Sequence, residues 1–358
     1  MLVHICCSVD SHFFLQRLQQ EFPEEKLLGF FYDPNIHPYS EYKLRLLDVE
    51  RSCKKLGIEL IEGDYDVEDW MSAVKGLESE PEKGARCEVC FDKRFEVSGH
   101  KALELGEDKF TTTLLVSPLK SQEQLKRSGE LFSKEHNIDF IYLDYRSSGG
   151  TQVQSQVSKE EQLYRQNYCG CLHGLNMQRE SQNRLADELM MPLGNRVLEG
   201  SVDERLAFYE HRMELEEQNI KYKILKQKFL NYRILSGRVL FGKNVVPAYF
   251  LHYSTLQKEK AQGRIEFSHD EIHYLNRDEV RFLKLSKFNE LANSSFKTVQ
   301  ELIFSPITLK EELKVRSKLT NNYDLSAIII VDNLQDLKIT IELKSKKYED
   351  VKEVLILN

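Results

Sequence analysis

Residues 2–22 read LVHICCSVDSHFFLQRLQQEF and join two different patterns. The first six residues form a short apolar run, which is typical of a buried strand. Further along, Phe14, Leu15, Leu18 and Phe22 recur at helical spacing. The stretch therefore predicts a β-strand that is followed directly by an α-helix.

The same alternation continues over the first 145 residues. Strand patterns occur at 26–34, 58–66, 109–117 and 139–145, and clear helical patterns occur at 40–57 and 121–137. Ser40 is placed as the N-cap of the first of these helices and Gly57 as its C-terminal stop. Repeated β-α-β units predict an α/β fold, with a parallel, doubly wound sheet covered by helices.

Composition indicates an ordinary globular protein. The chain has 358 residues, of which 41% are apolar and 30% charged, enough for about two domains. Its start lacks the basic region and long apolar run of a signal peptide, and no stretch reaches the ~20 apolar residues that span a bilayer. We expect a soluble, cytoplasmic protein with no membrane partner, divided into domains at 1–178 and 179–358.

The net charge of −7 is unevenly distributed along the chain. Residues 1–178 carry 21 Lys/Arg against 30 Asp/Glu, whereas residues 179–358 carry 29 against 27. Neither half is the uniformly basic surface of a non-specific polyanion binder. A local basic patch, or a structured RNA that is recognised by shape and by splayed bases, remains compatible with this distribution.

Six of the seven cysteines fall into three close pairs, which are Cys6 with Cys7, Cys87 with Cys90, and Cys169 with Cys171. Cys53 stands alone and is interpreted as a small buried apolar residue. Thiols stay reduced in the cytosol and a domain of this size needs no disulfides, so metal binding explains the pairs better. Soft thiolates select zinc or iron–sulfur clusters. Either one uses four ligands, which leaves two cysteines for a second metal or a redox pair.

The fold places the cysteine pairs near one edge of the sheet. Cys6 and Cys7 close the first strand, and the segments YDPNIHP (32–38) and VSPLK (116–120) close two others at the same edge. Spacing alone favours Asp10 as a helix N-cap or first-turn acid. The chain has no G-x-G-x-x-G, H-E-x-x-H or G-x-S-x-G motif, which argues against ordinary dehydrogenases, ATPases and hydrolases.

Five segments in this order resemble the QueH family of epoxyqueuosine reductases: HICCSVD (4–10), FYDPNIHPYSEYKLR (31–45), GARCEVCFDKR (84–94), FTTTLLVSPLK (110–120) and YRQNYCGC (164–171). The resemblance covers about residues 2–172. It implies a Rossmann-like (HUP-type) fold and reduction of epoxyqueuosine to queuosine, the last step of queuosine biosynthesis. The modified base occupies the wobble position of tRNAs with a GUN anticodon. The electrons would come from an external low-potential donor such as a ferredoxin or flavodoxin.

The resemblance also implies a [4Fe–4S] cluster and an adjacent second iron, with no need for cobalamin. Matching motifs assign seven metal ligands: Cys6, Cys7, Asp10, Cys87, Cys90, Cys169 and Cys171. Asp10 thereby becomes a catalytic residue rather than a helix cap. Which four cysteines hold the cluster stays open.

Six further residues are candidates for contacts with the nucleoside or the tRNA: Asn35, Tyr42, Arg45, Arg94, Tyr164 and Tyr168. Tyr164 and Tyr168 are suited to stacking on a splayed base. A half-buried aromatic residue explains Tyr42 equally well, and a solvated basic face explains Arg86, Lys93 and Arg94 equally well. We interpret His4 and His37 as hydrogen-bonded structural residues.

The second half has no cysteine, so it adds no thiolate site. Helical patterns are followed from Tyr222 by alternating residues, which predict antiparallel strands and a small α+β domain. Both tRNA docking and dimerisation are open to this domain. Two other functions are compatible with parts of the sequence, a zinc-dependent protein that modifies or binds RNA and a thiol redox protein.

Overall fold

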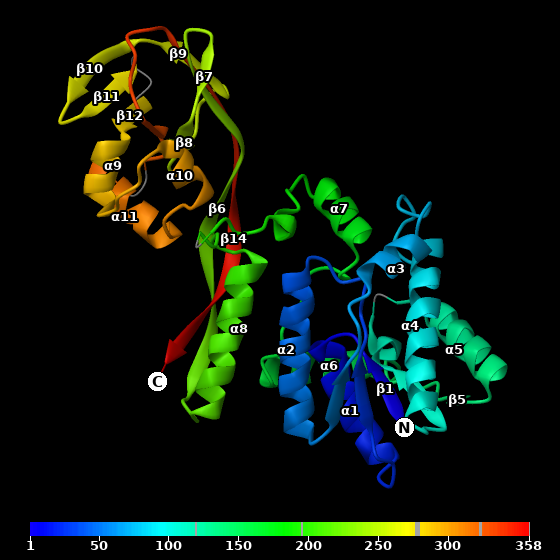
Figure 1. Ribbon diagram of the computed structural model, residues 1–358. Helices are drawn as coiled ribbons and strands as arrows, with labels where there is room; N and C mark the ends of the chain where they lie inside the picture. The colour runs from blue at the N-terminus through cyan, green and yellow to red at the C-terminus, as the bar shows by residue number, and fades with distance from the viewer. Residues whose placement is uncertain (119, 195, 276–279, 322–323, 358) are drawn as a thin grey trace. The chain divides into compact units, whose positions relative to one another are not determined.

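A computed structural model of the chain describes residues 1–118, 120–194, 196–275, 280–321 and 324–357. The chain forms two compact units, coloured by residue number in Figure 1. Unit 1 comprises Met1–Leu189, Arg205–Ile224 and Leu355–Asn358, and unit 2 comprises Met190–Glu204 and Leu225–Val354. All seven cysteines lie in unit 1. Within the described ranges, no helix combines the length and apolar character that crossing a membrane requires.

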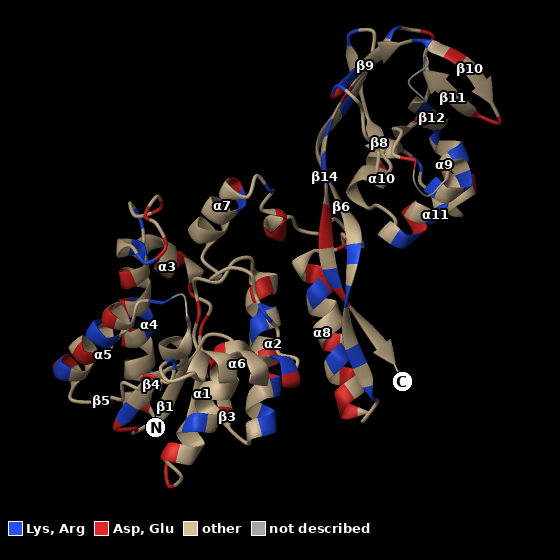
Figure 2. Ribbon diagram, turned by 180° about the vertical axis from the view of Figure 1, so that it is seen from behind, with Lys and Arg blue, Asp and Glu red and all other residues tan. Residues whose placement is uncertain are grey.

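Unit 1 contains the predicted parallel sheet. Its five strands are ordered β3-β2-β1-β4-β5, and every neighbouring pair is parallel. Helices cover both faces, with α1, α2 and α6 on one side and α4 and α5 on the other (Figures 1 and 2). The strands are β1 Leu2–Ile5, β2 Leu28–Phe31, β3 Glu59–Glu62, β4 Lys109–Thr112 and β5 Asp139–Phe140. The helices are α1 Ser8–Glu21, α2 Tyr39–Leu56, α3 Val67–Ala73, α4 Ala85–Glu104, α5 Gln122–His136, α6 Gly150–Glu160, α7 Leu172–Ser181 and α8 Val202–Glu217, with the short 3-10 turns η1 Thr113–Val116 and η2 Asp187–Leu189.

Local sequence signals explain several boundaries in unit 1. Helix α2 ends at Gly57, whose φ of 67° is the left-handed conformation that glycine adopts freely, as predicted. The predicted N-cap at Ser40 was wrong, because the helix already begins at Tyr39 and Pro38 occupies the cap position. Cys53 is buried in the main core, in agreement with its interpretation as an apolar residue.

The observed strands of unit 1 are shorter than the apolar patterns that predicted them, as two examples show. The 109–117 pattern is a strand only as far as Thr112, whose side chain accepts a hydrogen bond from the Leu114 amide and starts the 3-10 turn η1. Strand β5 covers Asp139 and Phe140 alone, at the edge of the sheet. Apolar residues beyond the ends of both strands still pack on the core, although they form no strand hydrogen bonds. An apolar pattern can therefore extend past the end of a strand.

The described residues of unit 2 form two sheets and three helices, which confirms the predicted α+β class. A mixed five-stranded sheet has the order β10-β11-β12-β13-β8, and a four-stranded sheet has the order β7-β6-β14-β9. The first sheet contains β8 Ala248–Phe250, β10 Ile265–His269, β11 Ile272–Leu275, β12 Val280–Lys284 and β13 Ile328–Val331. The second contains β6 Tyr222–Phe241, β7 Asn244–Val246, β9 Lys260–Gly263 and β14 Ile339–Leu357. The helices are α9 Leu285–Ala292, α10 Val299–Phe304 and α11 Leu309–Leu319.

Candidate metal centre

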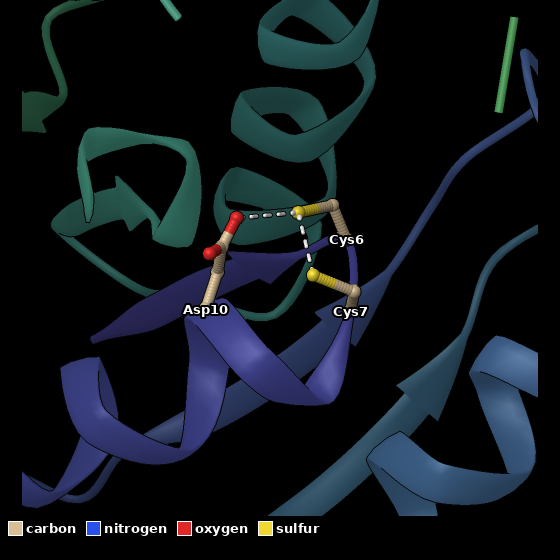
Figure 3. A group of neighbouring side chains, drawn as sticks. All are labelled: Cys6, Cys7 and Asp10. Carbon is tan, nitrogen blue, oxygen red and sulfur yellow. Dashed lines mark hydrogen bonds between the residues drawn. The ribbon is translucent and has the colours of Figure 1, made fainter. Parts of the chain in front are cut away.

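The first cysteine pair lies where β1 passes into α1. Cys7 occupies the N-cap position of α1, and Asp10 lies in its first turn. The Sγ of Cys6 is 3.8 Å from the Sγ of Cys7 and 3.8 Å from Asp10 Oδ2 (Figure 3). Ligand atoms of all three residues lie within 4.8 Å of one another, which is close enough for one metal ion to be shared.

Asp10 does not cap the helix, because Cys7 occupies that position and makes no side-chain cap hydrogen bond. The Asp10 carboxylate instead accepts a hydrogen bond of 2.7 Å from Gln154 Nε2 on α6. Burial raises the pKa of Asp10, although Lys120, Ser117 and Gln154 oppose the rise. A buried, oriented carboxylate beside two thiols is a suitable metal ligand.

The other two cysteine pairs lie close to each other. Cys87 and Cys90 lie on α4, one turn apart, whereas Cys169 and Cys171 lie in the segment that leads into α7. Cys90 and Cys171 are buried together against Trp70, and Cys169 packs against the same cluster. Burial raises the pKa of Cys87 and Cys171 and raises the pKa of Cys90 to about 12.

The Cys169–Cys171 segment is held by contacts that are remote in sequence. Ile36 forms a bridge with Cys171, and the His37 amide donates a hydrogen bond of 2.8 Å to the Gly170 carbonyl. Gly170 has a φ of 106°, and a Cβ there would lie 2.8 Å from Ile36 Cγ1. The Cys-Gly-Cys spacing therefore requires glycine both for its backbone conformation and for the close approach of the neighbouring loop.

Arg45 of α2 also contacts the Cys169–Cys171 segment. Its Nη1 donates a hydrogen bond of 3.0 Å to the Cys169 carbonyl, and its Nη2 donates one of 3.1 Å to the Tyr168 carbonyl. The Nε of Arg45 pairs with Glu41 at 2.8 Å, and both side chains are buried. The guanidinium thus fixes the backbone that presents Cys169.

Two buried cations accompany the thiols. Lys120 Nζ lies 3.0 Å from Cys169 Sγ. Burial raises the pKa of Cys169, but this lysine lowers it, and the net shift is downward. Arg94 pairs with Asp33 and also contacts His4 Nε2 at 3.3 Å. Burial lowers the pKa of Arg94, but Asp33 and the thiols of the site raise it by more. Arg94 therefore stays charged. Positive charge is thereby available to offset several thiolates.

A cavity of about 240 Å³ opens beside these groups. Its lining includes the predicted residues Cys6, Asp10, Arg45, Arg94, Tyr168 and Cys169, together with Asp33, Glu82, Ser117 and Lys120. Sequence reasoning missed the role of Lys120, although the segment VSPLK was placed at this edge. The signal available was a lysine just beyond a strand end that faces the cysteines.

The remaining predicted contact residues lie away from this lining. Tyr42 is buried and donates hydrogen bonds to Glu62 and to the Gly63 carbonyl. Tyr164 is buried as well, and its hydroxyl donates to Glu41 at 2.8 Å. Asn35 is buried, and among the described residues its Oδ1 has no hydrogen-bond partner.

The alternative of a solvated basic face around Cys87 and Cys90 does not apply to the two arginines there. Arg86 and Arg94 are each 2% exposed, and Arg86 donates to the backbone carbonyls of Leu77, Glu78 and Glu80. Lys93 pairs with Asp69. His4 is buried between Thr112 Oγ1 and the Tyr32 carbonyl, in agreement with a structural role.

Fold and site together define a class, an α/β protein with a cysteine-rich centre at the carboxyl edge of a parallel sheet. Residues 1–177 match the family described as "Epoxyqueuosine reductase QueH". The chain belongs to this family, and its reaction is the final step of queuosine biosynthesis, the reduction of epoxyqueuosine.

The relatives differ in length. An epoxyqueuosine reductase QueH of Helicobacter pylori is 39% identical over 98% of this chain and 98% of its own length. One of Thermotoga maritima is 32% identical and matches 95% of its own length to only 52% of this chain. A solved structure of the U34-tRNA thiolase NcsA from Methanococcus maripaludis, with its [4Fe-4S] cluster, is also similar to this chain. The match covers 60% of this chain and 73% of that one at 14% identity. Its TM-score of 0.33 is too low to support a conclusion.

Proposed function

We propose that this epoxyqueuosine reductase holds two metal groups in unit 1. Cys87, Cys90, Cys169 and Cys171 would bind a [4Fe–4S] cluster, and Cys6, Cys7 and Asp10 would bind a second iron. The single observation that carries this division is the convergence of the Cys6 and Cys7 sulfurs and the Asp10 carboxylate within 4.8 Å of one another. The other four cysteines then supply the four thiolates that a cluster needs.

The donor set fits these groups chemically. Buried thiols with raised pKa values stay protonated unless a cation replaces the proton, and a metal ion provides that cation. Four thiolates around a cluster also leave excess negative charge in a buried place. Arg94 and Lys120 lie among the thiols and reduce the cost of burying that charge.

Converting the epoxide to an alkene consumes two electrons and two protons and releases water. The cluster would supply electrons one at a time, and the adjacent iron would supply Lewis acidity. The protein's own residues prepare the site for this reaction. Gln154 orients the Asp10 carboxylate, Arg45 fixes the backbone of Cys169, and Lys120 stays charged beside the Cys169 sulfur.

The cavity has room for a base-sized group and not for a folded RNA, so the modified base would enter it splayed out of the anticodon. The substrate would then be a tRNA with a GUN anticodon. Arg45, Arg94 and Tyr168 line the cavity, and in this proposal they would contact that base. Electrons would come from an external low-potential protein of the ferredoxin or flavodoxin kind, and a cytoplasmic location suits both the tRNA and the seven free cysteines.

Metal analysis of single Cys→Ser variants tests the proposal. After anaerobic reconstitution, the wild type should be brown and contain iron with sulfide. Serine at Cys87, Cys90, Cys169 or Cys171 should lower both iron and sulfide, whereas serine at Cys6 or Cys7 should lower iron and spare sulfide. Cys53→Ser is the matched control and should equal the wild type.

Two outcomes would contradict the division. A colourless wild type with stoichiometric zinc would favour the zinc-dependent RNA-modifying alternative. Full iron and sulfide in two or more of the four cluster variants would remove those cysteines from the ligand set.

A further inference from the structure

The four-stranded sheet of unit 2 has one apolar face and one charged face. Along β14, Ile339, Ile341 and Leu343 are buried in a core cluster that also contains Val239 and Phe241 of β6. Side chains alternate across a strand, so the residues between them point away from this core. The outward positions of β14 begin with Lys338, directly before the strand, and continue through Thr340 and Glu342 to Lys344.

Strand register brings charged residues of three strands together on the outward face. The Gly242 amide donates a 2.8 Å hydrogen bond to the Lys338 carbonyl, which aligns β6 with β14, and Glu342 lies opposite Lys260 of β9. Glu342 pairs with Arg238 at 2.5 Å and with Lys260 at 3.4 Å. Between the rows of Lys338 and Lys346, the outward positions of β6, β14 and β9 carry one acid, Glu342, and five cations: Arg238, Lys260, Lys338, Lys344 and Lys346.

Three of these cations have no acidic partner. Within the described residues, no carboxylate pairs with Lys338, Lys344 or Lys346. Farther along the same strand the arrangement differs, because Lys352 pairs with Glu199 at 2.6 Å. This face therefore carries an excess of positive charge, and Figure 2 shows Lys and Arg gathered around β9 and the adjoining part of β14.

Protection of a sheet edge does not explain these lysines. Exposed edge strands commonly carry lysine because its charge opposes pairing with another chain. Strand β14, however, is an inner strand, with β6 on one side and β9 on the other. From Lys338 to Lys346 the cations extend over about 25 Å at the usual rise per residue.

From this face we infer that unit 2 docks the phosphate backbone of the substrate tRNA. The inference rests on the proposal that a tRNA carries the modified base. The first 178 residues carry 30 Asp/Glu against 21 Lys/Arg, so they are poorly suited to hold a long polyanion unaided. The outward face of the β7-β6-β14-β9 sheet supplies the complementary charge.

The chemistry of the face favours RNA over a protein partner. Protein interfaces are enriched in aromatic side chains and depleted in lysine, whereas phosphate contacts are made largely by lysine and arginine. The outward positions offer Thr340, Gln262 and Leu240 between the cations, and no aromatic ring. Contacts made by lysine and arginine alone would be insensitive to sequence and would position the tRNA rather than identify it.

Salt-dependent binding of the full chain to an unmodified tRNA with a GUN anticodon tests the inference. The test variant combines Lys338→Gln, Lys344→Gln and Lys346→Gln. The matched control combines Lys297→Gln, Lys310→Gln and Lys314→Gln, which removes three exposed lysines from the α10 and α11 region of the same unit. A third variant with arginine at positions 338, 344 and 346 keeps the charge.

Each lost phosphate contact lowers the slope of log K against log salt by about 0.7–0.9. The test variant should therefore lose about 2–3 from this slope and bind at least about tenfold more weakly at 0.15 M salt, while the control and the arginine variant should bind like the wild type. Because binding is measured without turnover, a failure of the proposed metal chemistry would leave this result intact.

Three results would overturn the inference. The test variant could keep the wild-type slope and affinity. The control could lose as much affinity as the test variant, which would make net charge the cause. The test variant could also change its oligomeric state in sedimentation while its slope stays the same, which would assign the face to contacts between copies of the chain.

Discussion

Replacing Arg45 by methionine tests whether this residue is a clamp for the cysteine segment or a contact for the tRNA. Methionine keeps much of the apolar stem and removes the guanidinium. The variant loses the hydrogen bonds to the carbonyls of Cys169 and Tyr168 and leaves Glu41 buried without its cation. Breaking a buried ion pair in this way costs about 3–5 kcal/mol. The hydroxyl of Tyr164, which also donates to Glu41, compensates only in part.

The chain offers a local probe for this loss. Trp70 is the single tryptophan of the chain, is fully buried in unit 1 and packs with Cys90 and Cys171. Urea unfolding of metal-free protein, followed by Trp70 fluorescence, therefore reports on the unit that contains Arg45. With a urea dependence of about 2–3 kcal/mol per M, the loss should lower the midpoint by about 1–2.5 M. Reconstituted Arg45→Met should also retain less iron and sulfide than the wild type.

Glu41→Gln combined with Arg45→Met removes the unpaired charge and should recover part of the lost stability. A wild-type midpoint and full metal content in Arg45→Met, together with weaker tRNA binding, would refute the clamp. That result would return Arg45 to the predicted role of a nucleoside or phosphate contact.

Two further predictions concern carboxyl groups of the site. Asp10→Asn keeps the size of the side chain and removes the charge that holds a divalent metal. The variant should keep its sulfide but lose conversion of epoxyqueuosine to queuosine with dithionite as reductant. Near wild-type conversion would contradict a ligand role for Asp10. Burial raises the pKa of Asp33 to about 7, so the folded state binds a proton that the unfolded state has released between about pH 4 and 7, and the wild type loses stability over that range. Asp33→Asn lacks this loss, and its Trp70 unfolding midpoint should rise relative to the wild type as the pH increases from 4 to 7, whereas a constant difference would show that Asp33 does not titrate there.

Much of unit 1 could be predicted from sequence because its signals are local. Strands and helices follow from apolar periodicity, and the end of α2 follows from Gly57. The three cysteine pairs were visible as pairs, and the order of five motifs identified the family. Local signals failed where buried residues are not paired in a strand. After β5, for example, apolar residues pack on the core without strand pairing.

In unit 2 the sequence correctly predicted strands after the initial helices, but it did not predict where each strand begins and ends. Strand β14 runs without a break from Ile339 to Leu357, and helices α9 to α11 were not predicted. Alternation within a strand shows which residues share a face. It does not show which strands become neighbours, so the basic face that joins Arg238, Lys260 and Lys344 could not be predicted.

The sequence by itself determined the three cysteine pairs, the parallel sheet and the family, because each depends on spacing over a few residues or on ordered motifs. Tertiary structure alone decided which groups meet. The approach of Lys120 to Cys169 joins residues 49 apart, and the hold of Arg45 on Cys169 joins residues 124 apart. Such contacts depend on strand order and on how loops cross the edge of the sheet, and no local pattern in a single sequence records them.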